Sequence, residues 1–167
     1  GIEGNITKFY YSILSENLLG RFAFEKRSFM PAKDEFNASL NYLYGVLYRK
    51  VERSLLNAGL DLNTGFLHSN KKKSLSLVFD FIEIFRHFAM SFNYSLFQSK
   101  KIRKSFFEYD KASVSLNKDG RNFLIGEFSD YLENTELYNN HHTKRIEIIK
   151  NEAFKFGDMI LELSKSF

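Results

Sequence analysis

Cysteine is absent from this 167-residue chain, so neither a disulfide scaffold nor a thiolate metal site is possible. There is only one proline and there are 9 glycines, and so few breakers favour long helices over many short strands. Tryptophan is missing too, yet 19 phenylalanines and 9 tyrosines bring the aromatic share to 17%. Rings in that number imply a packed interior rather than a disordered chain.

Long uninterrupted apolar runs are also lacking, because ionisable side chains break the longest one. A membrane span is therefore not expected. The beginning of the sequence shows no charged, apolar and small-residue signal pattern, and with the absence of disulfides this favours a cytoplasmic protein. The net charge of +4 permits an anionic partner without proving one.

Apolar residues recur at helical spacing in about five places, and period-two alternation is nearly absent. The second of these helices should begin near Asp34, a good N-cap residue, and should end at Gly59. The pattern predicts a single all-α domain over residues 1–167, a helical bundle of about five to seven helices around a central buried helix at about residues 74–97. The predicted helices cover residues 2–18, 34–59, 74–97, 118–133 and 146–163.

The predicted central helix is apolar on almost every side but carries one narrow polar stripe. At about 100° per residue, the stripe collects Ser76, Asp80, Glu83, His87, Ser91 and Tyr94, with Arg86 beside it. An ionised carboxylate held away from water costs several kcal/mol unless it is paired or bound to a metal. A divalent cation would solve this problem, and so would an internal ion pair of Glu83 with Arg86 or His87. The stripe alone leaves both explanations open.

A histidine and a lysine run lie just ahead of this helix, in the segment that follows Gly65. A lone histidine such as His68 is more often a satisfied polar residue than a metal ligand. Lys71, Lys72 and Lys73 would ordinarily form a solvated loop, although beside a metal they could hold phosphates.

Four segments in a fixed order carry a family resemblance: "GIEGNITKFYY", "FAFEKRSFMPAKDEFNASLNYLYGVLY", "AGLDLNTGFLH" and "SLSLVFDFIEIFR". In this order they resemble the C-terminal helical domain of the CRISPR spacer-acquisition integrase and endonuclease, the Cas-one family. The resemblance runs in register over about residues 1–97, and beyond that it is a general similarity of helices. In that family a β-rich N-terminal domain precedes the helical one, and we expect this chain to lack it.

The resemblance implies a site for one divalent ion, Mg2+ or Mn2+, held by Glu3, His68 and Glu83. Asp80 lies alongside and is expected to orient a ligand. The polar stripe therefore falls where the family has its site. Carboxylate oxygens suit hard cations, and an imidazole in the set also suits manganese.

The sequence departs from the family pattern at three points without removing a ligand. Some relatives have aspartate where Glu83 stands, the usual double proline is Pro31-Ala32 here, and Ile84 replaces a proline often found after the second acid.

The reaction implied by the resemblance is phosphoryl transfer on DNA, in which a 3′-hydroxyl attacks a phosphodiester of the CRISPR repeat. With water as the nucleophile, the same site would act as an endonuclease. We expect Lys71, Lys72, Lys73, Arg86 and Arg27 to contact DNA phosphates. The implied partners are double-stranded DNA (spacer precursors and the CRISPR repeat), a second copy in a homodimer of the full-length protein, and the small ferredoxin-like adaptation subunit of the Cas-two family.

Three other interpretations stay open at this point. The chain could be a helical scaffold whose acids and bases form a buried ion network, or a nonenzymatic nucleic-acid-binding module that uses only its basic groups. It could also contain the metal site yet have little activity on its own.

Overall fold

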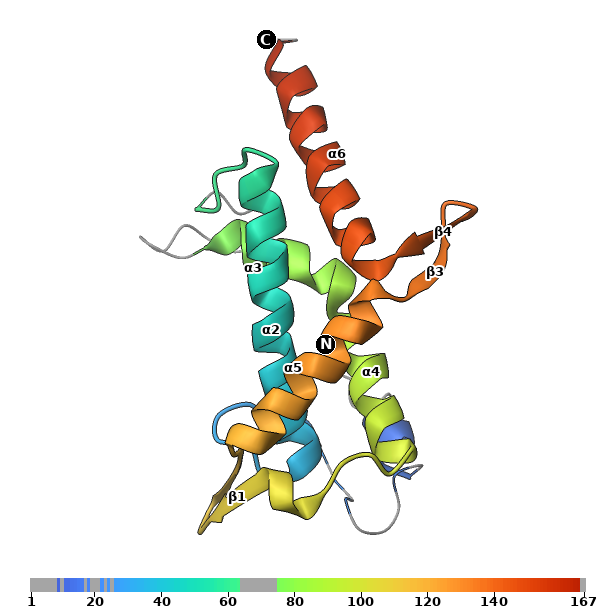
Figure 1. Ribbon diagram of the computed structural model, residues 1–167. Helices are drawn as coiled ribbons and strands as arrows, with labels where there is room; N and C mark the ends of the chain where they lie inside the picture. Colours follow the sequence, from blue (N-terminus) through green and yellow to red (C-terminus); the bar gives the residue numbers. More distant parts are fainter. Residues whose placement is uncertain are drawn as a thin grey trace. The chain divides into compact units, whose positions relative to one another are not determined.

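The computed structural model describes residues 9, 11–16, 18, 22, 24, 26–63 and 75–165. Figure 1 shows the helices and strands in chain order. They are α2 (Glu35–Asn57), α3 (Ser76–Ile82), the 3-10 turn η1 (Glu83–Phe85), α4 (Arg86–Gln98), the 3-10 turn η2 (Lys104–Phe106), β1 (Phe107–Asp110), β2 (Ser113–Leu116), α5 (Lys118–Glu133), β3 (Thr135–Tyr138), β4 (His141–Lys144) and α6 (Arg145–Lys165). Residues 11–16 are helical as well.

The chain divides into two compact units, which are described separately below. Unit 1 contains Gly1–Tyr44 and Phe88–Glu127, and unit 2 contains Gly45–His87 and Phe128–Phe167. The prediction of a single domain stays a prediction.

Helix α2 begins and ends where the sequence predicted. The Asn37 N–H donates to Asp34 Oδ1 at 2.8 Å, which caps the first turn. After the last turn, Gly59 adopts a φ of 75° and its N–H donates to Leu56 O, a conformation that favours glycine. The apolar stripe of α2 is fully buried: Phe36, Leu40, Leu43, Leu47, Val51 and Leu55.

Aromatic rings form the core of unit 1. The rings of Phe24 and Phe36 stack with centroids 4.3 Å apart, and Phe97 of α4 meets Phe36 edge-on at 5.3 Å. Asn93, also on α4, is fully buried and donates to Phe36 O at 3.2 Å. These contacts join α4 to the start of α2.

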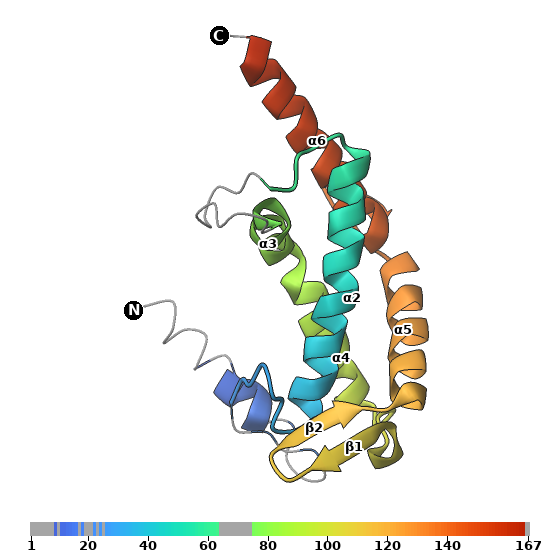
Figure 2. The same cartoon turned by 90° about the vertical axis from the view of Figure 1, so that its left-hand side faces the viewer.

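A short hairpin of strands β1 and β2 belongs to unit 1 and leads into α5 (Figure 2). Strands β1 and β2 pair antiparallel, and their end pair, Phe107 and Leu116, is buried. Asn117 caps α5 by accepting the Gly120 N–H at 2.9 Å, and its amide donates to Ser105 O at 2.7 Å. The chain around residues 105–106 therefore lies directly against the first turn of α5.

The predicted central helix is broken rather than continuous. Residues 74–97 were expected to form one helix, but a 3-10 turn at Glu83–Phe85 separates α3 from α4. In this turn the Arg86 N–H donates to Glu83 O, an i to i+3 bond that tightens the backbone. The period of the apolar residues could not reveal this break, because a single 3-10 turn hardly changes the spacing.

Unit 2 contains a second hairpin, which lies between α5 and α6 and projects from their junction in Figure 1. Strands β3 and β4 pair antiparallel around Asn139 and Asn140, which both have positive φ, as the tight turn of a two-residue hairpin requires. Helix α6 then packs closely on the chain after α2, where a Cβ added to Gly157 would lie 3.0 Å from Ala58 O.

The fold class is confirmed as predominantly helical, with only two small strand pairs among the described residues. Across residues 26–63 and 75–165 and the described positions before them, no helix is long and apolar enough to cross a membrane.

Candidate metal and nucleic-acid site

Several residues of the predicted site lie outside the described residues. These are two of the three predicted metal ligands, Glu3 and His68, and the three predicted phosphate contacts Lys71, Lys72 and Lys73. The structure does describe Asp80, Glu83, Arg86 and Arg27.

Asp80 and Glu83 lie three residues apart where α3 passes into η1, in unit 2. Asp80 is half-buried and Glu83 is the first residue of the 3-10 turn. The Arg86 guanidinium pairs with Glu83 Oε1 through Nη2 at 2.9 Å. His87 is exposed, with its Nδ1 3.0 Å from Ile84 O.

Aromatic packing holds this turn in place. Phe81 contacts Phe85 at 5.6 Å between ring centroids and Phe156 of α6 at 5.8 Å. On α3, the half-exposed Phe79 meets the ring of Tyr48 from α2 at 5.2 Å. The backbone that carries Asp80 and Glu83 is therefore fixed on two sides by its own unit.

The polar stripe is more exposed than the sequence predicted. The Glu83 side chain is 49% exposed and that of Arg86 is 41% exposed. The expectation that the Glu83 carboxylate is held away from water is therefore wrong, because Glu83 lies on an exposed face that already begins at Phe79 on α3. An exposed i,i+3 ion pair contributes little to stability, about 0–1 kcal/mol. Because the Glu83 carboxylate is partly in water, the cost of burying its charge does not require a bound metal ion.

The accessible carboxylates nevertheless fit a hard divalent cation. Two carboxylates one helical turn apart offer oxygen donors, and solvent exposure lets an ion reach the Glu83 carboxylate. Within the part of the chain that the structure describes, no three histidine, cysteine, aspartate or glutamate side chains gather as a metal site. A complete ligand set at this position depends on residues outside that part.

Arg27 lies in unit 1, where it belongs to a polar network before α2. Its guanidinium donates to Ser28 O, to Asn37 Oδ1 at 2.8 Å and to Asn41 Oδ1. It also lies over the Tyr44 ring at 5.6 Å from the centroid. No sequence pattern indicates the role of Asn41, because its contacts join residues more than ten positions apart.

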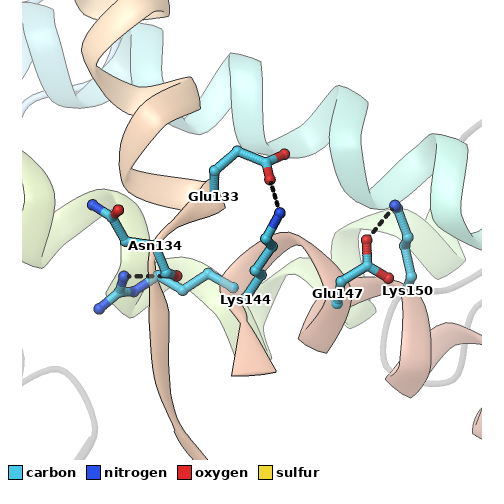
Figure 3. Close-up of polar contacts among 6 residues, drawn as sticks. Glu133, Asn134, Lys144, Glu147 and Lys150 are labelled. Atoms are coloured by element: carbon cyan, nitrogen blue, oxygen red, sulfur yellow. Dashed lines mark hydrogen bonds and ion pairs between the residues drawn. The ribbon is translucent and has the colours of Figure 1, made fainter. Parts of the chain in front are cut away.

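Two ion pairs not predicted from the sequence lie in this part of unit 2: one joins α5 to the β3–β4 hairpin, and the other lies within α6. Lys144 Nζ lies 2.9 Å from Glu133 Oε2, and Lys150 Nζ lies 2.6 Å from Glu147 Oε1 (Figure 3). The Lys144 ammonium bonds to Glu133 and holds the pKa of that carboxyl below its usual value. The Asn139-Asn140 turn was the available sequence signal for this hairpin.

Arg145 and Glu152 make further contacts between the β3–β4 hairpin, α5 and α6. The Arg145 guanidinium stacks 4.1 Å from the Tyr131 ring centroid, and its Nε lies 3.0 Å from Glu136 Oε2 as an ion pair without hydrogen-bond geometry. Glu152 accepts from Lys155 at 2.7 Å and from the Tyr138 hydroxyl. These groups fix the hairpin to α6 and do not resemble a catalytic centre.

The sequence of this chain matches the family described as CRISPR associated protein Cas1, over residues 1–130. The chain belongs to this family, and its helical fold fits the C-terminal domain.

Two curated relatives illustrate the match. A CRISPR-associated protein Cas1 of Methanobrevibacter ruminantium is 36% identical over 127 residues, which are 75% of this chain and 37% of that protein. A CRISPR-associated endonuclease Cas1 of Clostridium perfringens is 29% identical over 167 residues, which cover 96% of this chain and 51% of that protein. The chain thus spans about half the length of these relatives, or less.

Solved structures share the fold. A Cas1 protein from Thermotoga maritima superposes with a TM-score of 0.80 at 26% identity, covering 96% of this chain and 52% of that one. A casposase bound to its integration product gives a TM-score of 0.85 at 24% identity, with 94% and 45% covered. A Cas6-RT-Cas1–Cas2 complex gives 0.82 at 21% identity, with 98% and 18% covered. The last two are similar to this chain in fold alone.

Proposed function

We propose that this chain is the catalytic helical part of a metal-dependent DNA integrase and endonuclease of CRISPR adaptation. The observation that carries the proposal is membership of the Cas1 family together with a solvent-accessible carboxylate, Glu83, at the matching position of the acid motif. The relative from Clostridium perfringens is named an endonuclease, which supports nuclease activity here.

Glu3, His68 and Glu83 are the proposed ligands of one Mg2+ or Mn2+ ion. When bound, such an ion polarises a phosphoryl oxygen and stabilises charge on the leaving oxygen. Asp80, one turn before Glu83, is the group proposed to orient a ligand or a metal-bound water. Arg86 already holds one oxygen of Glu83 at 2.9 Å, so it sets the direction in which the carboxylate points.

The proposed reaction is a transesterification. The 3′-hydroxyl of a short duplex loses its proton and forms a new P–O bond, and the P–O bond to the 3′-oxygen of the repeat breaks and that oxygen takes up a proton. The number of phosphodiesters is unchanged, so no energy-rich cofactor is needed. Water in place of the hydroxyl gives strand cleavage.

The proposed partners are double-stranded DNA, a second copy of the full-length protein and the small adaptation subunit of the Cas2 type, in the cytoplasm. The fold shared with a Cas1–Cas2 complex and with a DNA-bound casposase supports this assignment. Lys71, Lys72, Lys73, Arg86 and Arg27 stay predicted phosphate contacts.

Metal binding can be tested without measuring activity, by thermal unfolding of the chain against increasing Mn2+. An ion that binds only the folded chain stabilises it by about 2.7 kcal/mol at 100 times its Kd. Glu83→Gln should abolish this gain, whereas Glu127→Gln, which breaks a surface pair with Lys101, should leave it intact. Equal Mn2+ stabilisation of both variants would refute the ligand role of Glu83.

Activity is then measured as strand cleavage or joining on CRISPR repeat DNA, with the cognate Cas2-type subunit present. Glu83→Gln should lose activity at unchanged helix content. If neither Mn2+ stabilisation nor activity is found for the parent chain, the proposed metal site fails, and DNA binding in the presence of a chelator then separates the nucleic-acid-binding interpretation from the scaffold interpretation.

A further inference from the structure

The loop before α2 presents two large apolar side chains to solvent. Met30 is 96% exposed and Phe29 is 64% exposed, side by side at the tip of residues 26–33 in unit 1. Single exposed apolar residues are common on protein surfaces, but two neighbouring large ones on a loop are a candidate contact point.

Side chains of α2 fix the backbone beneath this tip. Asn37 is fully buried and accepts the Ser28 N–H at 3.0 Å. Asn41 donates to both Ser28 O at 3.3 Å and Phe29 O. The Lys33 N–H donates to Ser28 Oγ at 3.0 Å and closes the loop. The backbone polar groups are thus held from inside the protein, and the apolar side chains are left facing outward.

Arg27 contacts the Phe29 ring and the side chains of α2. Its guanidinium lies 4.2 Å from the centroid of the Phe29 ring, and its nitrogens bond to Asn37 and Asn41. The Phe29 ring therefore rests on a cation while most of the residue stays exposed to solvent. Arg27 acts here as a positioning residue for Phe29.

Positive charge flanks the tip. Residues 26–33 contain Lys26, Arg27 and Lys33 and no acidic residue. Lys26 is exposed, and Lys33 donates through Nζ to Ala112 O at 2.9 Å, in the turn of the β1–β2 hairpin.

Acidic residues also flank this segment: Glu25, directly before it, lies outside the described residues, and the described acidic groups beside it accept hydrogen bonds within unit 1. Asp34 accepts from the backbone and the side chain of Asn37. Glu35 accepts from the Tyr109 hydroxyl. Asp110 is exposed and accepts the neighbouring Lys111 N–H, so it reduces the positive field only near the hairpin turn.

An apolar tip between cations is complementary to a nucleic acid, in which apolar base faces lie between phosphates. We infer that Phe29 and Met30 form a wedge that packs against a base of bound DNA, while Lys26 and Lys33 contact the flanking phosphates. Apolar wedges of this composition unstack base steps in other DNA-binding proteins, and aromatic rings stack on single bases. The inference rests on the proposed function, because it takes DNA as the substrate.

The absence of tryptophan from the sequence makes a direct test possible. Phe29→Trp places the sole indole of the protein at the tip, and Leu137→Trp places it at a similarly exposed position (68%) on β3. Stacking on a base should quench the emission of the first variant on adding branched repeat DNA and leave the second nearly unchanged. Equal quenching of both variants would overturn the wedge.

Binding measurements separate the apolar contact from the charges. The double variant Phe29→Ala with Met30→Ala should bind DNA about 5- to 150-fold more weakly, the range for losing one base–aromatic stack. The slope of log affinity against log salt should stay constant, because no charge changes. Lys26→Gln with Lys33→Gln should instead flatten this slope by about 0.9 for each phosphate of duplex DNA that the variant no longer neutralises.

The outcomes of these experiments are distinguishable. If the parent chain binds no DNA in the presence of Mn2+, the proposed function fails as a whole. If the parent chain binds and the Phe29 and Met30 double variant binds equally well, the wedge alone is refuted. A double variant that keeps its DNA affinity but changes the sedimentation of the chain would assign the tip to a protein contact, and this too overturns the inference.

Discussion

Asn37→Ala should be one of the most destabilising single substitutions in unit 1. The side chain is fully buried and makes four hydrogen bonds of 2.7–3.0 Å, to Ser28, Arg27, Lys26 and Asp34. Alanine leaves these partners without their bonds. A hydrogen bond contributes about 0.5–1.5 kcal/mol net, and a buried group left unsatisfied costs about 1–3 kcal/mol.

We therefore expect a loss of about 3–5 kcal/mol in the free energy of unfolding. It should be measured by urea denaturation at 25 °C with circular dichroism as the readout. The control is Asn63→Ala, an exposed asparagine whose two hydrogen bonds among the described residues are both to Asp61, and its loss should stay below about 0.5 kcal/mol. A loss under about 1 kcal/mol for Asn37→Ala would refute the view that this network holds the loop.

The same variant should show a characteristic pH dependence. Burial raises the pKa of Asp34, while the two hydrogen bonds from Asn37 lower it. Alanine removes the side-chain bond and keeps the backbone one, so the folded-state pKa of Asp34 rises further above the ordinary value of 3.8 and the folded state binds the proton more tightly than the unfolded state. The difference in stability between parent and variant should then be largest near pH 7 and shrink as pH falls through the folded-state pKa of Asp34, which lies above 3.8.

Other predictions address separate parts of the chain. Gly120→Ala should lower the free energy of unfolding by about 1–3 kcal/mol, because its Cβ would lie 2.9 Å from Phe106 Cβ and would also collide with Phe106 O. A melting temperature equal to that of the parent would contradict this. Burial acts to raise the pKa of Glu152, but the bonds from Lys155 and a tyrosine hydroxyl outweigh it and lower the pKa, so stability is lost as pH falls below about 4.5. Glu152→Gln should reduce this loss of stability at acid pH, measured as the melting temperature between pH 3 and 7. An unchanged pH dependence in the variant would contradict the role of Glu152. Arg86→Gln should change the free energy of unfolding by less than about 1 kcal/mol, because its ion pair is half-exposed; a larger loss in urea would show a buried role.

The helices could be predicted because their signals are local. The apolar stripe of α2, its Asp34 cap and its Gly59 stop all lie within the segment they define, and α5 matches the predicted 118–133. The two hairpins were missed because each strand has only four residues, too few for period two to stand out.

The candidate site could be predicted only in part. Glu83 was placed on a helical face from its spacing, but whether that face is exposed depends on how the helix packs, as Phe81 does against Phe156, which is a tertiary effect. The network around Asn37 likewise joins positions up to 14 residues apart, so no spacing rule reveals it.

The near-complete exposure of Met30 has a practical consequence for handling the protein. Of the three methionines, Met90 is buried and Met159 is about half exposed, so the thioether of Met30 is the one most open to peroxide. Oxidation there would yield a polar sulfoxide on a side chain that touches no core, so a stored sample would keep its melting temperature. An aged preparation would thus unfold at the same temperature as a fresh one although its affinity for a substrate had already changed.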